Sequence, residues 1–238
     1  MKAVILAGGR GTRLAPYTTV FPKPLVPVGN MPILEIIIRQ LITAGVTEVT
    51  LTLGYLGELI RAFFAAHKTL GKLINIKFID EEEPTGTAGS LRLVPDLPET
   101  FLVMNGDVLT TLDYRRLMEF HQGSGAMLTI AGYRKTVKID LGVLQLQGIP
   151  PEVTGYIEKP EYVYPVSMGV YIYDRKALDY IPEGQYFDFP SLVLRLIQEK
   201  QKVACFETDE IWLDIGRTDD YVHAQQVFSE NIERFMMA

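Results

Sequence analysis

A glycine-rich segment near the start of the chain has the composition of a phosphate-binding loop. Residues 6–14 have the sequence Leu-Ala-Gly-Gly-Arg-Gly-Thr-Arg-Leu and directly follow an apolar run. Gly8, Gly9 and Gly11 lack the Cβ atoms that would keep a phosphate away from the backbone, and they permit a positive φ. Consecutive N–H groups in such a turn can hold an anion, and the guanidinium of Arg13 suits phosphate oxygens. Taken alone, the segment also fits a plain tight turn between a strand and a helix.

The surroundings of this loop narrow its possible function. It lacks the third glycine of the dinucleotide-binding fingerprint and the Gly-Lys-Ser/Thr ending of a P-loop. A further cation follows at Lys23, which stands between Pro22 and Pro24. Because both prolines restrict the backbone, the lysine should point in one consistent direction. An exposed lysine in a proline-rich turn that has no function is the alternative.

Two aspartates far apart in the sequence each follow a short apolar run. Asp107 comes after Phe101–Met104, and Asp214 comes after Trp212-Leu213. In open α/β sheets, ligands bind outside the carboxyl ends of the strands, where these side chains should lie. Two carboxylates can share a Mg²⁺ ion, which commonly takes one or two protein carboxylates together with phosphates. A single aspartate at a strand end more often caps a turn or a helix, so both interpretations stay open from these residues alone.

Residues 6–32 resemble the opening of the sugar-1-phosphate nucleotidylyltransferase family. The family pattern is L-A-G-G-x-G-T-R-L, then P-x-T, then P-K-P-L-x-P-V and a later proline. After the complete first segment, this sequence supplies Pro16, Thr18, Pro22-Lys23-Pro24-Leu25, Pro27-Val28 and Pro32 in matching order. The resemblance covers almost the whole chain, because it continues through Asn105-Gly106-Asp107, Glu158-Lys159-Pro160 and Trp212-Leu213-Asp214-Ile215-Gly216.

The resemblance implies a nucleotide site built mainly from the first half of the chain. Arg13 and Lys23 would be its catalytic cations, and Asp107 and Asp214 would hold Mg²⁺. Residues 81–90 would contact the base, because small residues let the backbone lie against a flat ring and an acidic side chain can accept its hydrogen bonds. The implied nucleotide-binding residues are Leu6, Ala7, Gly8, Gly9, Gly11, Thr12, Glu82, Gly86, Thr87, Ala88 and Asn105.

The sugar phosphate would bind to the second half of the chain. By resemblance, Glu158 would contact sugar hydroxyls and Lys159 the sugar phosphate. Gly142, Ser167 and Gly169 would form walls of the sugar pocket. Many relatives carry Asn where this chain has Ser167, so the sequence departs from the family pattern at that sugar contact.

The implied reaction is an in-line displacement at the α-phosphorus of an NTP by a sugar 1-phosphate, with pyrophosphate leaving. This nucleophile is ionised at neutral pH, so catalysis needs positioning and charge neutralisation and no general base. The base loop Gly-Thr-Ala-Gly, residues 212–217 and Asp220-Tyr221 are most similar to the mannose- or heptose-1-phosphate guanylyltransferase branch, which predicts GTP as donor. The alternatives are an enzyme that uses UTP or dTTP and a non-catalytic regulator that binds nucleotide-sugars.

These residues require a fold that gathers distant strand ends. Short apolar runs at 3–7, 48–53, 74–79 and 100–104 predict strands, and apolar spacing predicts helices over 32–44 and 58–67. Such alternation is typical of a doubly wound sheet. The second half predicts helices over 114–121, 190–199 and 219–236, and strands over 127–132, 142–147, 155–157, 166–173 and 202–206.

We therefore expect one α/β domain over residues 1–238, with a Rossmann-like, doubly wound, mostly parallel sheet. The resemblance implies the nucleotide-diphospho-sugar transferase type of this fold. Residues 1–110 would form a nucleotide-binding front half and residues 111–238 a sugar-phosphate-binding back half. Since the sequence ends after its closing helix, no C-terminal β-helix domain is expected.

Composition limits the partners and the location. A net charge of −6, from 23 basic and 29 acidic residues, argues against nucleic acid or an anionic membrane as partner. No apolar stretch approaches the ~20 residues of a membrane span, and the first residues reach glycine too soon for a signal peptide, so we expect a cytoplasmic protein. The single cysteine, Cys205, excludes an internal disulfide and lies in an apolar run that predicts a buried side chain. The expected partners are an NTP and a sugar 1-phosphate, and a homo-oligomer is compatible with the sequence.

Overall fold

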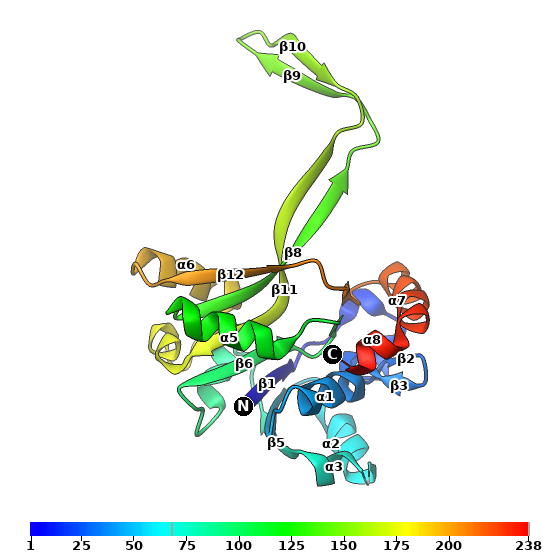
Figure 1. The fold of residues 1–238 in the computed structure, drawn as a ribbon, viewed down its shortest axis with the longest axis vertical. Coiled ribbons are helices and arrows are strands. Elements are labelled where there is room, and N and C mark those ends of the chain that lie inside the picture. The colour runs from blue at the N-terminus through cyan, green and yellow to red at the C-terminus, as the bar shows by residue number, and fades with distance from the viewer. Residues whose placement is uncertain (68, 238) are drawn as a thin grey trace.

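Strands and helices alternate along the first half of the chain and build one central sheet (Figure 1). The structure is a computed structural model that describes residues 1–67 and 69–237. The strands are β1 (Lys2–Ala7), β2 (Pro27–Val28), β3 (Met31–Pro32), β4 (Glu48–Leu53), β5 (Asn75–Asp80), β6 (Thr100–Asn105), β7 (Val108–Thr110), β8 (Leu128–Lys138), β9 (Val143–Gln147), β10 (Glu152–Ile157), β11 (Glu161–Asp174), β12 (Val203–Thr208) and β13 (Trp212–Asp214).

The helices connect these strands and cover the sheet. The α-helices are α1 (Ile33–Thr43), α2 (Gly57–Ala66), α3 (Leu70–Leu73), α4 (Gly86–Gly89), α5 (Tyr114–Ser124), α6 (Phe189–Gln198), α7 (Thr218–Glu230) and α8 (Ile232–Met237). Short 3-10 turns are η1 (Thr12–Leu14), η2 (Tyr17–Thr19), η3 (Lys23–Leu25), η4 (Ser90–Leu93) and η5 (Arg175–Tyr180). Within the described residues, no helix combines the length and the apolar composition needed to cross a membrane.

The central sheet has seven strands in the order β12-β8-β11-β6-β1-β4-β5. β11 runs antiparallel to both of its neighbours, and every other neighbouring pair is parallel. This arrangement confirms the predicted mostly parallel α/β sheet. The parallel strands β6, β1, β4 and β5 all end at the same edge, where their connecting loops meet.

Two apolar clusters lie on opposite faces of this sheet. Because successive side chains of a strand point to opposite faces, β1 divides its residues between them. Ala3, Ile5 and Ala7 belong to the cluster that contains α1, whereas Val4 belongs to the cluster that contains residues of α4, η4 and α6. Helices thus cover both faces, as a doubly wound sheet requires.

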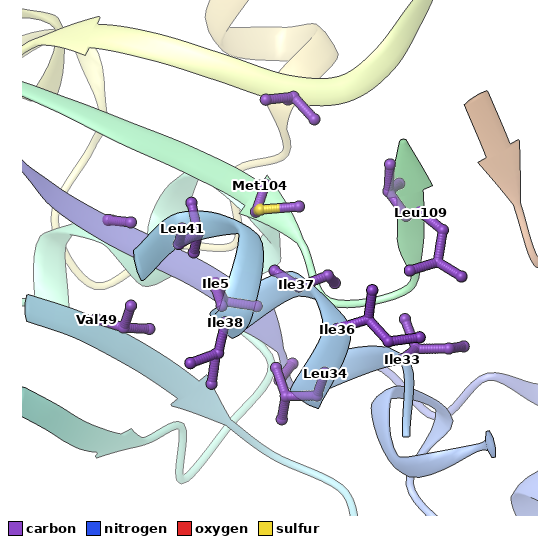
Figure 2. Packing of buried hydrophobic residues seen from close by; sticks show 14 of the residues in the cluster. Ile5, Ile33, Leu34, Ile36, Ile37, Ile38, Leu41, Val49, Met104 and Leu109 are labelled. Carbon is purple, nitrogen blue, oxygen red and sulfur yellow. The ribbon is translucent and has the colours of Figure 1, made fainter. Parts of the chain in front are cut away.

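Helix α1 is buried on most of its circumference. Ile36, Ile37 and Ile38 are consecutive, and all three are fully buried. The reason is that α1 packs on the sheet and is also contacted by β7 and α8. Figure 2 shows Ile5 and Met104 gathered around this helix. The sequence predicted a helix with a single apolar face. In the structure, the buried surface of α1 extends beyond that one face.

An antiparallel arm leaves the sheet and projects from the body (Figure 1). It consists of the outer parts of β8 and β11, with β9 and β10 at its tip, and we call residues 133–166 the arm. The pairing of β8 with β11 continues without a shift from Tyr133 opposite Val166 to Lys138 opposite Glu161. Most residues of the arm are exposed.

The sequence analysis predicted strands over 127–132 and 166–173, which are shorter than β8 and β11, and it did not predict the arm. The reason is that the outer parts of these strands have no buried face and therefore no regular apolar alternation. The closing helix predicted over 219–236 is divided into α7 and α8 at Asn231, whose side chain donates to the Val227 carbonyl at 2.9 Å.

Cys205 is exposed, which contradicts the prediction of a buried thiol. It lies on β12, the strand at one edge of the sheet, where the covering of the two faces ends. An apolar run therefore predicted the strand but not the environment of each side chain in it.

Replacement of Ile37 by alanine should lower the free energy of unfolding by about 2–5 kcal/mol, because the fully buried side chain leaves a cavity. Ile37→Val removes one methyl group and should cost about 0.5–1.5 kcal/mol. Urea titration followed by circular dichroism measures both. Equal stabilities for the two variants would contradict the packing described for α1.

Candidate active site

A cleft of about 680 Å³ opens at the sheet edge where β1, β4, β5 and β6 end. Its lining combines the loops after these strands with the segment that carries Lys23. Every predicted catalytic and nucleotide-binding residue except Ala88 lines this cleft, and Asp107 lines it as well. The structure therefore brings together side chains that lie as far apart in sequence as Leu6 and Asp107.

The glycine-rich loop is fitted to the cleft by close backbone contacts. Ala7 of β1 lies opposite Leu53 of β4, so Gly8 and Gly54 follow these strands side by side. A Cβ atom on Gly54 would lie 2.6 Å from the Gly8 carbonyl oxygen, which no side chain could tolerate. A Cβ atom on Gly9, in contrast, would meet no heavy atom within 4 Å. Gly54 is thus required by the fold, and Gly9 leaves open space beside the backbone.

Lys23 is held at the floor of the cleft. Gly11 has a φ of +59°, and a Cβ atom there would lie 3.1 Å from Cβ of Lys23, so the lysine stem packs on the loop. The Thr18 hydroxyl donates to the Gly11 carbonyl at 2.8 Å and joins the two segments. Lys23 is 7% exposed, and its ammonium group contacts Oδ2 of Asp107. The lysine is therefore a buried member of an ion pair and not an exposed residue in a turn.

Asp107 and Asp214 lie close together. Asp107 precedes β7, Asp214 ends β13, and these strands pair antiparallel with Asp214 opposite Val108. Burial raises the pKa of Asp214 above its ordinary value, and the negative charge of Asp107 raises it further. The positive charges of Lys23 and Arg13 offset part of this rise in pKa. The two carboxyl groups thus repel each other at the edge of the cleft.

This donor set fits Mg²⁺. Among the described residues, no group of three or more His, Cys, Asp or Glu side chains forms a cage for a metal ion. Two carboxylates at the edge of this cleft match an ion that is commonly bound through one or two carboxylates and by phosphates of the substrate. A divalent cation between Asp107 and Asp214 would also remove the repulsion that raises the pKa of Asp214.

The predicted base loop is fixed by segment 185–189. Gly86 has a φ of +83°, and a Cβ atom there would lie 2.6 Å from the Phe187 carbonyl oxygen. The N–H of Phe189 donates to the Thr87 hydroxyl at 2.8 Å. Ala88 is the exception among the predicted residues: its side chain is fully buried in the apolar core, and its N–H donates to Phe187. Gly86 and Thr87 line the cleft, whereas Ala88 supports the loop from behind.

One of the predicted sugar-pocket residues, Gly169, lies beside Asn105, a predicted nucleotide-binding residue. Gly169 has a φ of +77°, and a Cβ atom there would lie 2.7 Å from Nδ2 of Asn105. The Ser167 hydroxyl donates to the Tyr171 hydroxyl at 3.2 Å, and the pairing of β11 with β8 is irregular between these two residues. This irregularity lies at the base of the arm, and Gly169 within it lies next to the end of β6.

The other predicted sugar-binding residues lie on the arm. Gly142, Glu158 and Lys159 flank β9 and β10 at its tip, and none of them lines the cleft. A Cβ atom on Gly142 would overlap the Tyr156 hydroxyl, which donates to the Glu158 carboxylate at 2.9 Å. Lys159 has a φ of +45°, a left-handed conformation that is costly for a residue with a side chain. The structure thus separates the predicted sugar-phosphate ligands from the nucleotide cleft.

Several cleft residues were not predicted from the sequence: Arg10, Gly54, Tyr55 and Tyr186. Gly54 had a usable signal, because it ends a strand in the same way as Gly8. No sequence signal indicated Tyr186, since it reaches the cleft only through the packing of segment 185–189 against the base loop. The buried Ser90 hydroxyl has no hydrogen-bond partner within the described chain.

The family model described as Nucleotidyl transferase matches residues 2–231 of this chain. The mannose-1-phosphate guanylyltransferase catalytic subunit beta of Danio rerio is 32% identical over 98% of this chain. The mannose-1-phosphate guanyltransferase of Saccharomyces cerevisiae is 31% identical over the same share. The chain spans 66% of the length of each of these relatives.

Solved structures give the same result for the fold. HddC from Yersinia pseudotuberculosis is 28% identical and superposes with a TM-score of 0.74, covering 95% of this chain and 99% of its own. A second structure of HddC, complexed with GMP-PN, superposes with a TM-score of 0.69 over the same shares.

Removal of the cation from the buried ion pair should destabilise the protein. Lys23→Met leaves Asp107 unpaired beside Asp214, so we expect the free energy of unfolding to fall by about 1–3 kcal/mol. This is less than for a fully buried pair, because the side chain of Asp107 is 24% exposed. The double variant Lys23→Met/Asp107→Asn removes both charges and should recover most of the loss in a urea titration. An unchanged stability of Lys23→Met would contradict the ion pair.

Proposed function

Because the chain belongs to the nucleotidyl transferase family, we propose that it transfers a nucleotidyl group from an NTP to a sugar 1-phosphate and releases pyrophosphate. The observation that carries this proposal is the cleft in which the glycine-rich loop and the Lys23–Asp107 ion pair meet Asp214. Relatives named mannose-1-phosphate guanylyltransferase, and a neighbouring structure complexed with GMP-PN, favour GTP as donor. A mannose- or heptose-type sugar 1-phosphate is the proposed acceptor.

In the proposed reaction, a phosphate oxygen of the sugar 1-phosphate attacks the α-phosphorus of the NTP. A new P–O bond forms there, and the bond from the α-phosphorus to the oxygen that bridges to the β-phosphate breaks. Both reactants are polyanions, so their close approach is costly without cations between them. Backbone N–H groups of Gly8, Gly9 and Gly11 would hold the triphosphate. Lys23 would neutralise charge at the α-phosphate, and Arg13 would neutralise charge on the departing pyrophosphate.

Asp107 and Asp214 are the proposed holders of Mg²⁺. When bound, the ion would supply positive charge to α-phosphate oxygens and help to orient the reactants. Lys23 contributes to this arrangement as well, because its contact with Asp107 holds that carboxylate at the floor of the cleft.

The proposed acceptor contacts come from two places. Ser167 and Gly169 would form the wall next to Asn105. Glu158 would bind sugar hydroxyls and Lys159 the sugar phosphate. Gly142 would act indirectly. Because it has no Cβ atom, the Tyr156 ring can pack beside it, and the hydroxyl of that ring orients the Glu158 carboxylate.

Pyrophosphate release from five NTPs, each combined with several sugar 1-phosphates and Mg²⁺, tests the proposal. We expect GTP to be used with a mannose- or heptose-type acceptor. Turnover only with UTP or dTTP would overturn the guanylyl assignment. Tight binding of a nucleotide-sugar without any turnover would favour a regulatory protein instead. An NTP donor is consistent with a reaction in the cytoplasm.

We expect Asp214→Asn to lower Mg²⁺-dependent turnover by about a hundredfold or more, the size of effect seen when one electrostatic group of an active site is removed. The same substitution should stabilise the metal-free protein at neutral pH, because it removes the repulsion from Asp107. Turnover is measured by pyrophosphate release and stability by thermal unfolding in EDTA. Near-normal turnover with Mg²⁺ would contradict the metal assignment.

The stability gain should depend on pH. Burial and Asp107 raise the pKa of Asp214, so the native state binds this proton more tightly than the unfolded chain does. The free energy of unfolding therefore falls as the pH rises between the unfolded and native pKa values, and it stays lowered above them. Asp214→Asn removes this contribution, so its advantage in thermal unfolding should vanish below about pH 3.9, the ordinary pKa of an aspartate. An advantage that persists in acid would have another cause.

Base preference should depend on Glu82. The carboxylate of Glu81 accepts the Thr85 hydroxyl at 2.7 Å, whereas Glu82 lines the cleft and can accept the N1–H and the amino group of guanine. Since an unpaired buried polar group costs about 1–3 kcal/mol, we expect Glu82→Gln to lower the preference for GTP over UTP, as a ratio of kcat/KM, roughly tenfold or more. Glu83→Gln is the matched control, because Glu83 lies in the same loop outside the cleft lining. An unchanged ratio in Glu82→Gln would indicate that the backbone of the loop, and not this side chain, recognises the base.

A further inference from the structure

The arm carries residues that the cleft of its own chain lacks. Under the proposed function, Glu158 and Lys159 must reach the phosphates bound in the cleft, yet both lie at the tip of an arm that projects away from the body (Figure 1). Lys23, Arg13 and Asp107 line the cleft, and no arm residue does. Each copy of the chain thus has an incomplete site and a set of unused acceptor ligands.

The arm is not built to fold back onto its own cleft. β8 and β11 remain paired without a register shift from Tyr133 opposite Val166 to Lys138 opposite Glu161. Six residue pairs of this kind give a continuous ribbon about 20 Å long, at about 3.4 Å per residue. Bending within this ribbon would break backbone hydrogen bonds that the structure satisfies, so the ribbon keeps Glu158 and Lys159 away from the body.

The tip of the arm presents an apolar face. Leu144 pairs with Tyr156, and Leu146 pairs with Val153, so these four side chains are cross-strand neighbours on β9 and β10. Each is more than half exposed. A two-stranded sheet is at best marginally stable alone in water, so a face of this kind needs a surface that covers it. Because the Tyr156 hydroxyl holds Glu158, the surface that covers this face must also lie beside Glu158 and Lys159.

The body offers such a surface at the mouth of the cleft. The segment between the cleft residues Arg13 and Lys23 exposes Tyr17, Val20 and Phe21, and Tyr186 adds an exposed ring from the cleft lining. The cleft mouth of the chain thus carries exposed apolar side chains, as does the tip of the arm, and the ribbon keeps these two surfaces of one copy apart.

We propose that two copies of the chain exchange arms, so that Glu158 and Lys159 of each copy complete the cleft of the other. The proposal rests on the proposed function, because that function assigns these residues to the acceptor. Reciprocal exchange makes a closed two-fold dimer in which both apolar faces are covered. The partner that completes the site is therefore a second copy of this chain.

Mixed dimers test this arrangement. Lys159→Ala disables the arm, and Asp107→Asn disables the cleft. The two variants are co-expressed with different affinity tags, and the mixed dimer is isolated through both tags. If arms are exchanged, the copy with Lys159→Ala has an intact cleft that the arm of the other copy completes. The mixed dimer should then show about half of the parent rate, one working site in two, while each variant alone shows little. A parent dimer that is active, with a mixed dimer no faster than the single variants, would overturn the proposal.

Sedimentation velocity tests the same arrangement without any substrate, so failure of the proposed function is distinguished from failure of arm exchange. The parent should sediment as a dimer, and Leu144→Glu/Leu146→Glu should sediment as a folded monomer with unchanged circular dichroism. Leu194→Glu is the matched control, because it charges a similarly exposed leucine on α6 of the body and should remain a dimer. A monomeric parent, or a dimer that survives both charges on the arm, would overturn the proposal. A parent that dimerises through the arm but turns over no NTP would instead overturn the proposed function.

Discussion

Repulsion between two carboxylates is the constraint on which the rest of the site depends. Asp107 and Asp214 are brought together by the pairing of β7 with β13. Burial of the carboxyl group raises the pKa of Asp214, and the negative charge of Asp107 raises it further. Such a pair is tolerated only with positive charge beside it, which explains why Lys23 is buried against Asp107 and why Arg13 lies near Asp214. The same electrostatic need makes the cleft receptive to a divalent cation and, with it, to the phosphates of a substrate.

Backbone contacts, more than side-chain packing, set the shape of the nucleotide half of the cleft. Gly8 meets Gly54 because β1 and β4 are in parallel register, and Gly86 meets the backbone of Phe187. At Gly54 and Gly86, any side chain would overlap a carbonyl oxygen. The cleft is therefore shaped by where the strands end, and its open space beside Gly9 follows from a missing side chain and not from a flexible loop.

The sugar half is organised differently. Gly169 lies beside Asn105 at the base of the arm, whereas a regular ribbon places Glu158 and Lys159 away from the body. Because the hydrogen-bonded ladder of the ribbon is continuous, the ribbon keeps the tip of the arm away from the body. The tip carries an apolar face that is exposed to water. The proposed donor contacts and two of the proposed acceptor contacts, Glu158 and Lys159, thus lie on separate parts of the molecule.

The sequence by itself determined the fold class and most of the residues that line the cleft. Glycine spacing, Lys23 between prolines and the runs before Asp107 and Asp214 are local features, so the cleft lining and the mostly parallel sheet could be predicted from them. It could not predict that Lys23 is buried, that Ala88 faces the core or that Cys205 is exposed, since burial depends on which elements pack together. Nor could it predict the arm, because strands without a buried face lack an apolar alternation. Tertiary structure decided which of the predicted ligands share a cleft, because distances between segments far apart in the chain are set by strand order and register.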